Sequence, residues 1–313
     1  MAASLLEIRD LNVKFRTDAG LVDACNGIDL MIRERESLCL IGESGCGKSV
    51  VALAILNLLP ENAIISGEVI FKGRDLLNLN EKEMRGVRGN EISMIFEQPG
   101  TCLNPVFPIG DQIAEALRIH EHLRKNEAKE KAVELMVHVG ISPQRYGEYP
   151  HQFSGGMQQR VMIAMALAFR PSIIVADEPT TSLDLITQAQ ILDLLKKVSQ
   201  ENNISLFLIT HDLGVVWEMC DSLAVMYAGE IVERAPIYEF FHSPMHPYSK
   251  ALLGSISKSG FHPIGGSVPN LTDLLDGCRF HPRCDKCSDI CKKLRPKMTY
   301  FSTRGVRCHH YSA

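Results

Sequence analysis

The chain has 313 residues, of which 45% are hydrophobic, so it can build one large domain or two modest ones around an apolar core. Its net charge of −4 and isoelectric point of about 6.3 give no global basic field, which argues against a nucleic-acid partner. No apolar run is long enough to cross a bilayer, and no basic flank precedes an apolar core at the N-terminus, so we expect no signal peptide.

The first predicted elements form an antiparallel β-ribbon. Residues 5–15 and 22–32 alternate between apolar and polar side chains, and residues 17–20 between them are typical of a turn. The ribbon makes Phe15 a candidate to stack on a nucleotide base. A place in the ordinary core is the equal alternative for this ring.

The next segment carries the strongest signal in the chain, a phosphate-binding loop. Residues 42–49 read Gly-Glu-Ser-Gly-Cys-Gly-Lys-Ser and fit the pattern Gly-x4-Gly-Lys-[Ser/Thr]. A strand-type run, Ser37–Ile41, precedes the loop, and the helix-forming residues 50–59 follow it, so a helix N-terminus faces the bound anion. Lys48 can reach the β- and γ-phosphates and the Ser49 hydroxyl can bind Mg²⁺, which predicts a nucleoside triphosphate site. The residues expected to contact the nucleotide here are Gly42, Glu43, Ser44, Gly45, Cys46, Gly47, Lys48 and Ser49.

Strands and helices alternate through the rest of the chain up to about residue 210. Strand-type runs are expected at residues 67–71, 91–96, 173–176 and 206–210. Helical spacing marks residues 110–140, 155–169 and about 186–200. This order predicts an α/β fold with a mainly parallel, helix-covered sheet.

Two acids follow the apolar run 173–176. Ligands of such sheets lie beyond the C-terminal strand ends, so Asp177 and Glu178 should approach the phosphate loop. Asp177 is suited to hold Mg²⁺ through a water molecule, and Glu178 to polarise the attacking water. A solvated acid pair at a strand end is the alternative.

Residues 153–160 (Phe-Ser-Gly-Gly-Met-Gln-Gln-Arg) add a feature that a generic nucleotide hydrolase lacks. Ser154 can cap the following helix, and Gly155 and Gly156 allow its N-terminus to press closely on an anion. Alone the pattern is a weak loop signal. Between the phosphate loop and the acid pair it becomes specific.

Together these motifs resemble the ATP-binding subunit of ABC transporters, from residue 5 to the end of the chain. The resemblance implies a P-loop NTPase fold of the ABC type, with a mainly parallel sheet, an antiparallel β-subdomain and a helical subdomain at about residues 100–165, all within residues 1–245. It assigns residues 42–49 to Walker A, residues 154–158 to the signature, and Asp177 and Glu178 to Walker B. It makes His211 the catalytic switch that contacts the γ-phosphate, although a lone histidine there would otherwise be a capping residue. Further residues that it implies at the nucleotide are Ser154, Gly155, Gly156, Gln158 and the D-loop residue Asp184.

The same resemblance implies partners. In this family two nucleotide-binding domains enclose two ATP molecules, each contacted by Walker A of one domain and the signature of the other. Because each motif occurs once here, a second ATPase subunit is expected, usually a different chain. Two transmembrane permease subunits and, through them, an extracytoplasmic solute-binding protein are also implied. The chain should then be peripheral, on the cytoplasmic face of the cell (inner) membrane.

One motif departs from the family pattern. The family has Phe-Gln-(Asp/Glu)-Pro at the Q-loop, whereas this chain has Phe96-Glu97-Gln98-Pro99. Glu97 offers a hard oxygen to Mg²⁺ but adds like-charge repulsion near Glu178 and the phosphates. Our hypothesis is altered hydrolysis or coupling, and the equal alternative is a neutral exchange in which Gln98 substitutes. Residues 99–108 should contact the membrane subunits.

The last part of the chain resembles the extension of the oligopeptide/dipeptide/nickel importer group, and the dipeptide-importer ATPases most closely. Residues 246–253 and 277–284 carry this likeness, so residues 246–313 are predicted to be a small Cys-rich module. Four of its cysteines have the spacing C-x5-C-x6-C-x16-C and correspond to those that hold a [4Fe–4S] cluster in some members: Cys278, Cys284, Cys291 and Cys308. Zinc and plain thiols are the alternatives, and the additional Cys287 leaves the choice of ligands open.

The sequence therefore indicates an ATP-hydrolysing subunit that powers import of di- or oligopeptides. Nickel and oligosaccharide importers use the same type of ATPase and stay as alternatives. Two other classes also stay open. One is a soluble ABC ATPase of DNA repair or translation, although the usual coiled-coil insertion or second cassette is missing, and the other is a regulatory nucleotide-binding protein with weak turnover.

Overall fold

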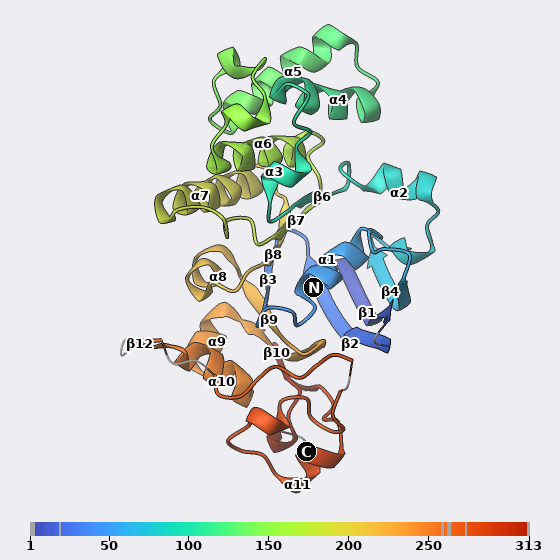
Figure 1. Cartoon of the computed structure of the whole chain (residues 1–313), viewed down its shortest axis with the longest axis vertical. Helices are drawn as coiled ribbons and strands as arrows, with labels where there is room; N and C mark the ends of the chain where they lie inside the picture. The colour runs from blue at the N-terminus through green and yellow to red at the C-terminus, as the bar shows by residue number, and fades with distance from the viewer. Residues whose placement is uncertain (1–3, 19, 258–259, 262–263, 273, 312–313) are drawn as a thin grey trace. The chain divides into compact units, whose positions relative to one another are not determined.

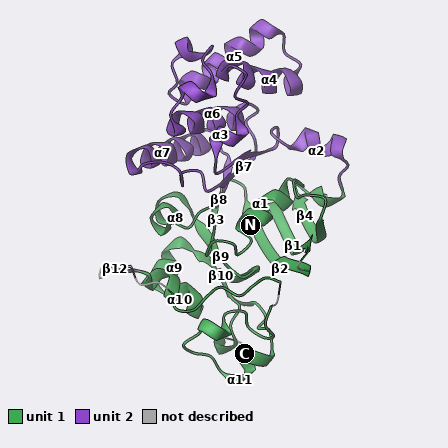
Figure 2. Ribbon diagram, in the orientation of Figure 1, with its two compact units in different colours: residues 1–78, 209–313 green, residues 79–208 purple. Residues whose placement is uncertain are grey.

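A computed structural model describes residues 4–18, 20–257, 260–261, 264–272 and 274–311. The chain folds into two compact units, one formed by Met1–Asn78 with Ile209–Ala313 and the other by Leu79–Leu208 (Figure 2). Residues 246–313 thus share a unit with the N-terminal segment. A boundary at residue 245 stays a prediction.

The first unit contains the predicted antiparallel β-subdomain. Its strands β1 (Ser4–Thr17), β2 (Gly20–Arg33), β4 (Ala63–Phe71) and β5 (Arg74–Asp75) lie in the order β2-β1-β4-β5 (Figure 1). Alternate side chains point into a common apolar layer, as the period of two requires. The fully buried members of that layer include Leu6, Leu11, Val13, Ile28, Ile32, Val69 and Phe71.

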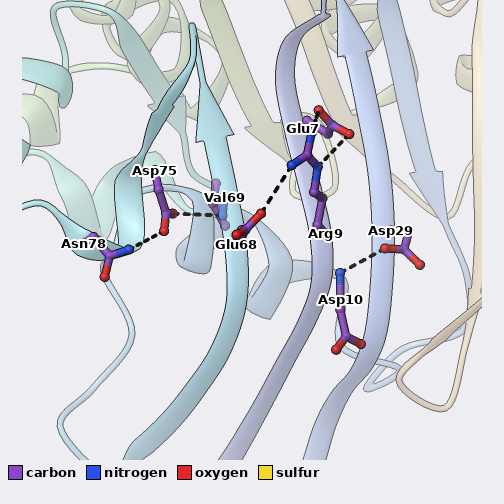
Figure 3. Close-up of polar contacts among 8 residues, drawn as sticks. All are labelled: Glu7, Arg9, Asp10, Asp29, Glu68, Val69, Asp75 and Asn78. Atoms are coloured by element: carbon purple, nitrogen blue, oxygen red, sulfur yellow. Dashed lines mark hydrogen bonds and ion pairs between the residues drawn. The ribbon is translucent and has the colours of Figure 1, made fainter.

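Exposed residues of this sheet form several polar contacts with one another (Figure 3). Arg9 binds Glu7 at 2.8 Å and Glu68 at 3.4 Å, but all three side chains are substantially exposed, so these ion pairs stabilise the sheet little. Asp75 accepts a hydrogen bond of 3.1 Å from the backbone N–H of Val69 and fixes the short strand β5. The apolar layer is therefore the main stabilising element of this sheet.

A second sheet in this unit carries the phosphate loop. β3 (Ser37–Ile41) pairs in parallel with β9 (Ser222–Tyr227), and the order continues antiparallel through β10 (Glu230–Pro236), β14 (Arg304–Val306) and β13 (Thr299–Phe301). The loop leads from β3 into α1 (Lys48–Ile55). This helix ends before residue 59, where we had predicted it to end, because Asn57 adopts a left-handed conformation (φ 48°).

Short elements complete this unit. Besides α1, its described helices are α8 (Leu213–Met219), α9 (Ile237–His242), α10 (Pro247–Gly254) and α11 (Asp289–Lys293). It also has the antiparallel pair β11 (Ile256–Ser257) and β12 (Gly260–Phe261) and the 3-10 turns Leu76–Asn78, His281–Arg283 and His309–Tyr311. Two buried acids of β10 hold the Cys-rich segment. Glu230 pairs with Arg279 at 3.0 Å and Arg295 at 2.7 Å, and Glu233 pairs with Arg304 at 3.2 Å.

The second unit contains part of a parallel sheet and most of the long helices. β6 (Ile92–Ile95) pairs in parallel with β7 (Ile173–Asp177), whose other neighbour is β8 (Ser205–Ile209). Every residue of β7 is buried, which explains its uninterrupted apolar sequence. The strand predictions 91–96, 173–176 and 206–210 are confirmed to within two residues.

The helices of this unit are α2 (Glu81–Val87), α3 (Pro99–Cys102), α4 (Ile109–Glu121), α5 (Lys125–His138), α6 (Gly155–Leu167) and α7 (Leu185–Asn202), with 3-10 turns at Pro143–Arg145 and Pro150–Gln152. The helical region predicted at residues 110–140 is a pair, because His122 takes a left-handed conformation (φ 53°) and ends α4. In the described residues, no helix is both long and apolar enough to span a bilayer.

Candidate nucleotide-binding site

The phosphate loop is pressed against neighbouring strands at two glycines. Gly42 (φ 159°) and Gly47 (φ 106°) have backbone conformations that side chains rarely adopt. A Cβ atom at Gly42 would collide with the carbonyl of Met226, and one at Gly47 with the carbonyl of Ala24. Only glycine fits at these two positions, so the loop pattern has a direct steric cause.

The amine of Lys48 and the N-terminus of α1 both place positive charge at the loop. The Lys48 amine, on a residue that is only 8% exposed, donates to the carbonyl oxygens of Gly42 (2.8 Å) and Glu43 (3.1 Å). Ser44, Gly45 and Ser49 are exposed, and the first turn of α1 contains no acidic side chain. Free N–H groups at a helix N-terminus beside a buried ammonium are suited to hold an anion.

Two other predicted residues lie in the same unit. Phe15 is half-buried and pairs with Val22 of β2 and Ala63 of β4, which decides neither of its alternatives. His211 is exposed two residues after the end of β8 and lines a cavity of about 290 Å³ together with Gly42 and Glu43.

The C-terminal extension supplies residues to this cavity that the sequence did not reveal. Arg283 lines the cavity and forms an ion pair with Glu43 at 2.7 Å, and Tyr248 of α10 accepts a hydrogen bond of 3.0 Å from the Glu43 N–H. These partners lie 240 and 205 positions from Glu43, so no local pattern could have identified them.

The acid pair and its strand lie in the second unit. Asp177 ends β7 and is only 8% exposed, whereas Glu178 is half-buried and has a left-handed backbone (φ 46°). For a non-glycine residue that conformation costs on the order of 1 kcal/mol and is typical of functional sites. The Thr181 hydroxyl donates a hydrogen bond of 2.8 Å to the Glu178 carboxylate and fixes its direction.

The signature segment caps α6 as predicted. The Ser154 hydroxyl accepts a hydrogen bond of 3.4 Å from the N–H of Met157. Gly155 is exposed at the helix start, whereas Gly156 is buried against Thr187 of α7, where a Cβ would collide with the Thr187 Cγ2 atom. The amide of Gln158 donates to the carbonyl of Pro150 at 2.8 Å, so this side chain holds the loop that leads into the signature.

Asp184 links the D-loop to the same helix. It caps α7 by accepting from the N–H groups of Ile186 and Thr187 and from the Thr187 hydroxyl at 2.7 Å. The hydrogen bond from Thr187 lowers the pKa of Asp184. Since Thr187 also contacts Gly156, the signature helix and the D-loop pack against each other.

The Q-loop residues Glu97 and Gln98 lie exposed between β6 and α3. The backbone carbonyl of Gln98 accepts a hydrogen bond of 2.8 Å from the hydroxyl of Thr101 in α3. Their exposed location is compatible both with altered hydrolysis or coupling and with a neutral exchange of Glu97, so both hypotheses stay open.

The predicted metal ligands of the extension are near one another but do not form a ligand set. Within the residues that the structure describes, no three His, Cys, Asp or Glu side chains are arranged to hold a metal ion. Burial raises the pKa of Cys278 to about 12 and also raises the pKa values of Cys284 and Cys308, which favours neutral thiols. The structure therefore does not support the iron–sulfur cluster or zinc that the sequence suggested.

A glycine loop that opens a helix, with a buried strand that ends in acids, defines a P-loop nucleotide hydrolase. Residues 25–181 match the ABC transporter family, and residues 232–291 match the oligopeptide/dipeptide transporter C-terminal region. The chain belongs to the ABC transporter family and is an ATPase of the ABC type, as its motifs predicted.

Similar proteins agree with this assignment. The chain is 46% identical over 305 residues to the probable peptide ABC transporter ATP-binding protein y4tR of Sinorhizobium fredii, covering 94% of this chain and 91% of that protein. It is 44% identical over 314 residues to the dipeptide transport ATP-binding protein DppD of Bacillus subtilis, covering 97% and 94%. Among solved structures, the dimeric ATP-binding cassette MJ0796 with ADP and Pi is 27% identical with a TM-score of 0.67, over 74% of this chain and 98% of that one.

Proposed function

We propose that this chain is the ATP-hydrolysing subunit of an ABC importer for di- or oligopeptides. The observation that carries the proposal is the joint match of the ATPase region and the residue 232–291 extension, together with relatives named for peptide and dipeptide transport. Nickel or oligosaccharide import, and a soluble or purely regulatory ABC protein, have no comparable support.

The roles of the phosphate-loop residues follow from their chemistry. The Lys48 amine and the amides of residues 43–49 bind the phosphates, Phe15 stacks on the adenine, and His211 contacts the γ-phosphate. The exposed Ser49 hydroxyl and the Asp177 carboxylate are hard oxygen donors that suit Mg²⁺, with Glu97 as a further candidate. When bound, Mg²⁺ neutralises phosphate charge.

Glu178 is the proposed general base. Its carboxylate, held by Thr181, takes a proton from the attacking water as that water adds to the γ-phosphorus and ADP leaves. Removing the negative charge with the matched amide, Glu178→Gln, should leave binding intact and abolish turnover.

The signature implies a second ATPase chain, and we propose a heterodimer. Ser154, Gly155, Gly156 and Gln158 would form the signature contact to the nucleotide held by the partner, with Asp184 beside them. Supporting this reading, Ser154 and Gly155 are exposed at a helix N-terminus.

We further propose that residues 99–108 dock on two permease subunits, which receive solute from an extracytoplasmic binding protein. Val106 is 71% exposed and Phe107 is 52% exposed in this segment, an unusual amount for apolar side chains. The chain would then be peripheral, on the cytoplasmic face of the cell (inner) membrane.

We retain a metal group in the extension as a proposal. After burial, the charges of Cys291 and Cys308 contribute to the raised pKa values of Cys278 and Cys284, so these four cysteines lie near one another. A small rearrangement with loss of protons would be needed for a [4Fe–4S] cluster or zinc to bind. Iron, sulfide and zinc analysis of anaerobically purified protein decides between them, and absence of all three leaves plain thiols.

The proposed function is tested by isolating the tagged chain with its membrane companions and reconstituting the complex in vesicles. Added di- or oligopeptide with its receptor should stimulate ATP hydrolysis and be accumulated, and Glu178→Gln should abolish both. Stimulation by nickel or a sugar instead, or co-isolation of no membrane subunit, would overturn the proposal.

A further inference from the structure

Glu43, the second residue of the phosphate loop, is held by the C-terminal extension. Both terminal nitrogens of Arg283 donate to its carboxylate, Nη1 to Oε2 at 2.7 Å and Nη2 to Oε1 at 2.9 Å. This is the parallel, two-point geometry in which a guanidinium holds a carboxylate most firmly. The hydroxyl of Tyr248 also accepts from the Glu43 N–H, so side chain and backbone are both fixed.

Arg283 is itself fixed from several sides. Its Nε donates to the carbonyl of Gly265 at 2.9 Å, and its Nη2 donates to the carbonyl of Ile264 at 3.1 Å. Its Nη1 lies 3.3 Å from the Tyr227 hydroxyl, and its side chain is only 3% exposed. The hydrogen bond to Glu43 raises the pKa of Arg283, so the guanidinium stays charged. These contacts hold the guanidinium group of Arg283 in one position.

Glu43 lies close enough to the expected phosphate site for its charge to affect the binding of a polyphosphate. Its own carbonyl accepts from Lys48, the amine expected at the β- and γ-phosphates, and Glu43 lines the same cavity as His211. An unpaired carboxylate beside this loop would repel the triphosphate, and partial burial would strengthen the repulsion over that in water. Arg283 cancels that charge and holds the Glu43 carboxylate at two points.

We propose that Arg283 is a positioning residue through which the C-terminal extension sets the affinity of the phosphate loop for MgATP. The inference rests on the proposed role of residues 42–49 in binding nucleotide. It differs from a simple attachment of the extension, because attachment would make both partners of the ion pair equally important. Charge cancellation instead makes them unequal, since only loss of Arg283 leaves a charge that repels phosphate.

The test is calorimetric titration of MgATP into the full chain and three variants, Arg283→Gln, Glu43→Gln and the double variant. Arg283→Gln should weaken affinity by at least about tenfold. Glu43→Gln alone should bind as tightly as the native chain or more tightly, because the remaining charge attracts phosphate. The double variant, which lacks the ion pair altogether, should recover affinity to within about threefold of the native value, the difference expected when no net charge remains.

Arg304→Gln is the matched control. It removes another arginine of the same extension from a buried glutamate, Glu233 on β10, which does not line the loop cavity. It should lower the melting temperature without changing MgATP affinity. If Arg283→Gln fails to fold, Glu43→Gln alone preserves the test, because charge cancellation requires that it bind MgATP at least as tightly as the native chain, whereas simple attachment requires that it bind more weakly.

The proposal is overturned by native affinity in Arg283→Gln, by weaker than native affinity in Glu43→Gln, or by a double variant that binds as weakly as Arg283→Gln. An equal shift in Arg304→Gln would also overturn it. Failure of the native chain itself to bind MgATP, alone and in its assembled complex, would instead refute the proposed nucleotide site, so the two failures are distinguishable.

Discussion

Gln112 and Asn104 exchange two hydrogen bonds of 2.9 Å: the Asn104 N–H donates to the amide oxygen of Gln112, and the Gln112 amide nitrogen donates to the Asn104 carbonyl. The same nitrogen also donates to the carbonyl of Phe107 at 2.9 Å. Gln112 lies in the first turn of α4 and is almost fully buried. One side chain thus gives a defined shape to the turn that exposes Val106 and Phe107.

Replacing Gln112 with Leu should weaken attachment to the membrane subunits while leaving nucleotide binding intact. The change removes three hydrogen bonds and leaves backbone groups of the turn unpaired, at a cost of about 1–3 kcal/mol in local stability. Co-purification of permease subunits and solute-stimulated ATPase should both fall, whereas MgATP affinity of the separate chain should stay native. Glu115→Gln, on an exposed position of α4, is the control, and full assembly of Gln112→Leu would contradict the prediction.

Gly156→Ala should destabilise the second unit through a single steric contact. The added methyl group meets Thr187 Cγ2 across the α6–α7 packing, and overpacking of this kind costs about 1–3 kcal/mol. Thr187→Ser removes that atom and keeps the hydroxyl that binds Asp184, so the double variant should recover most of the lost stability. The free energy of unfolding in denaturant, measured for the native chain, both single variants and the double variant, completes this double-mutant cycle. A double variant no more stable than Gly156→Ala would show that another contact is responsible.

The features that the sequence predicted correctly are those whose structure depends on residues close together along the chain. The phosphate loop, the ribbon around residues 17–20 and the acids after β7 are local patterns, and the structure contains the elements that carry them. It could not predict the partners of Glu43, because Tyr248 and Arg283 approach it only after the extension folds back. The break between α4 and α5 was also missed, since His122 has no side-chain signature for its left-handed backbone. The metal ligands were inferred from cysteine spacing and from resemblance to the family, and among the described residues the side chains do not form a ligand set.

Because of His246, the free energy of unfolding should decrease as the pH falls below about 6.5, the ordinary pKa of histidine. Burial lowers the pKa of this fully buried imidazole from 6.5 to about 3, and its neutral Nδ1 accepts from the Tyr248 N–H at 3.0 Å as the cap of α10. The fold therefore binds fewer protons than the unfolded chain between these values. Its contribution is complete above about pH 6.5 and is lost as the pH falls towards 3, with a slope of up to about 1.4 kcal/mol per pH unit.

His246→Asn tests this directly, because asparagine also caps helices and does not titrate. Its melting temperature should depend less on pH than that of the native chain between pH 6.5 and 4. His242→Asn, at an exposed position of α9, should follow the native profile. An unchanged acid dependence in His246→Asn would assign the effect to other groups.

Glu97→Gln should raise the ATPase rate of the assembled complex or tighten its coupling to solute. The native carboxylate adds negative charge where the family has a neutral amide, and under the proposed role of the Q-loop at the nucleotide this second anion opposes the charge that develops during hydrolysis. The carboxylate is exposed, so a severalfold change is more reasonable than one of many orders, since solvent screens it. Steady-state hydrolysis with and without solute measures both effects.

The swap Glu97→Gln with Gln98→Glu restores the family order and keeps the net charge. If position rather than total charge matters, the swap should behave as Glu97→Gln does. Equal rate and coupling in the native chain, Glu97→Gln and the swap would instead make the exchange neutral. In that case Gln98→Ala should lower the rate, because Gln98 would then supply the missing amide.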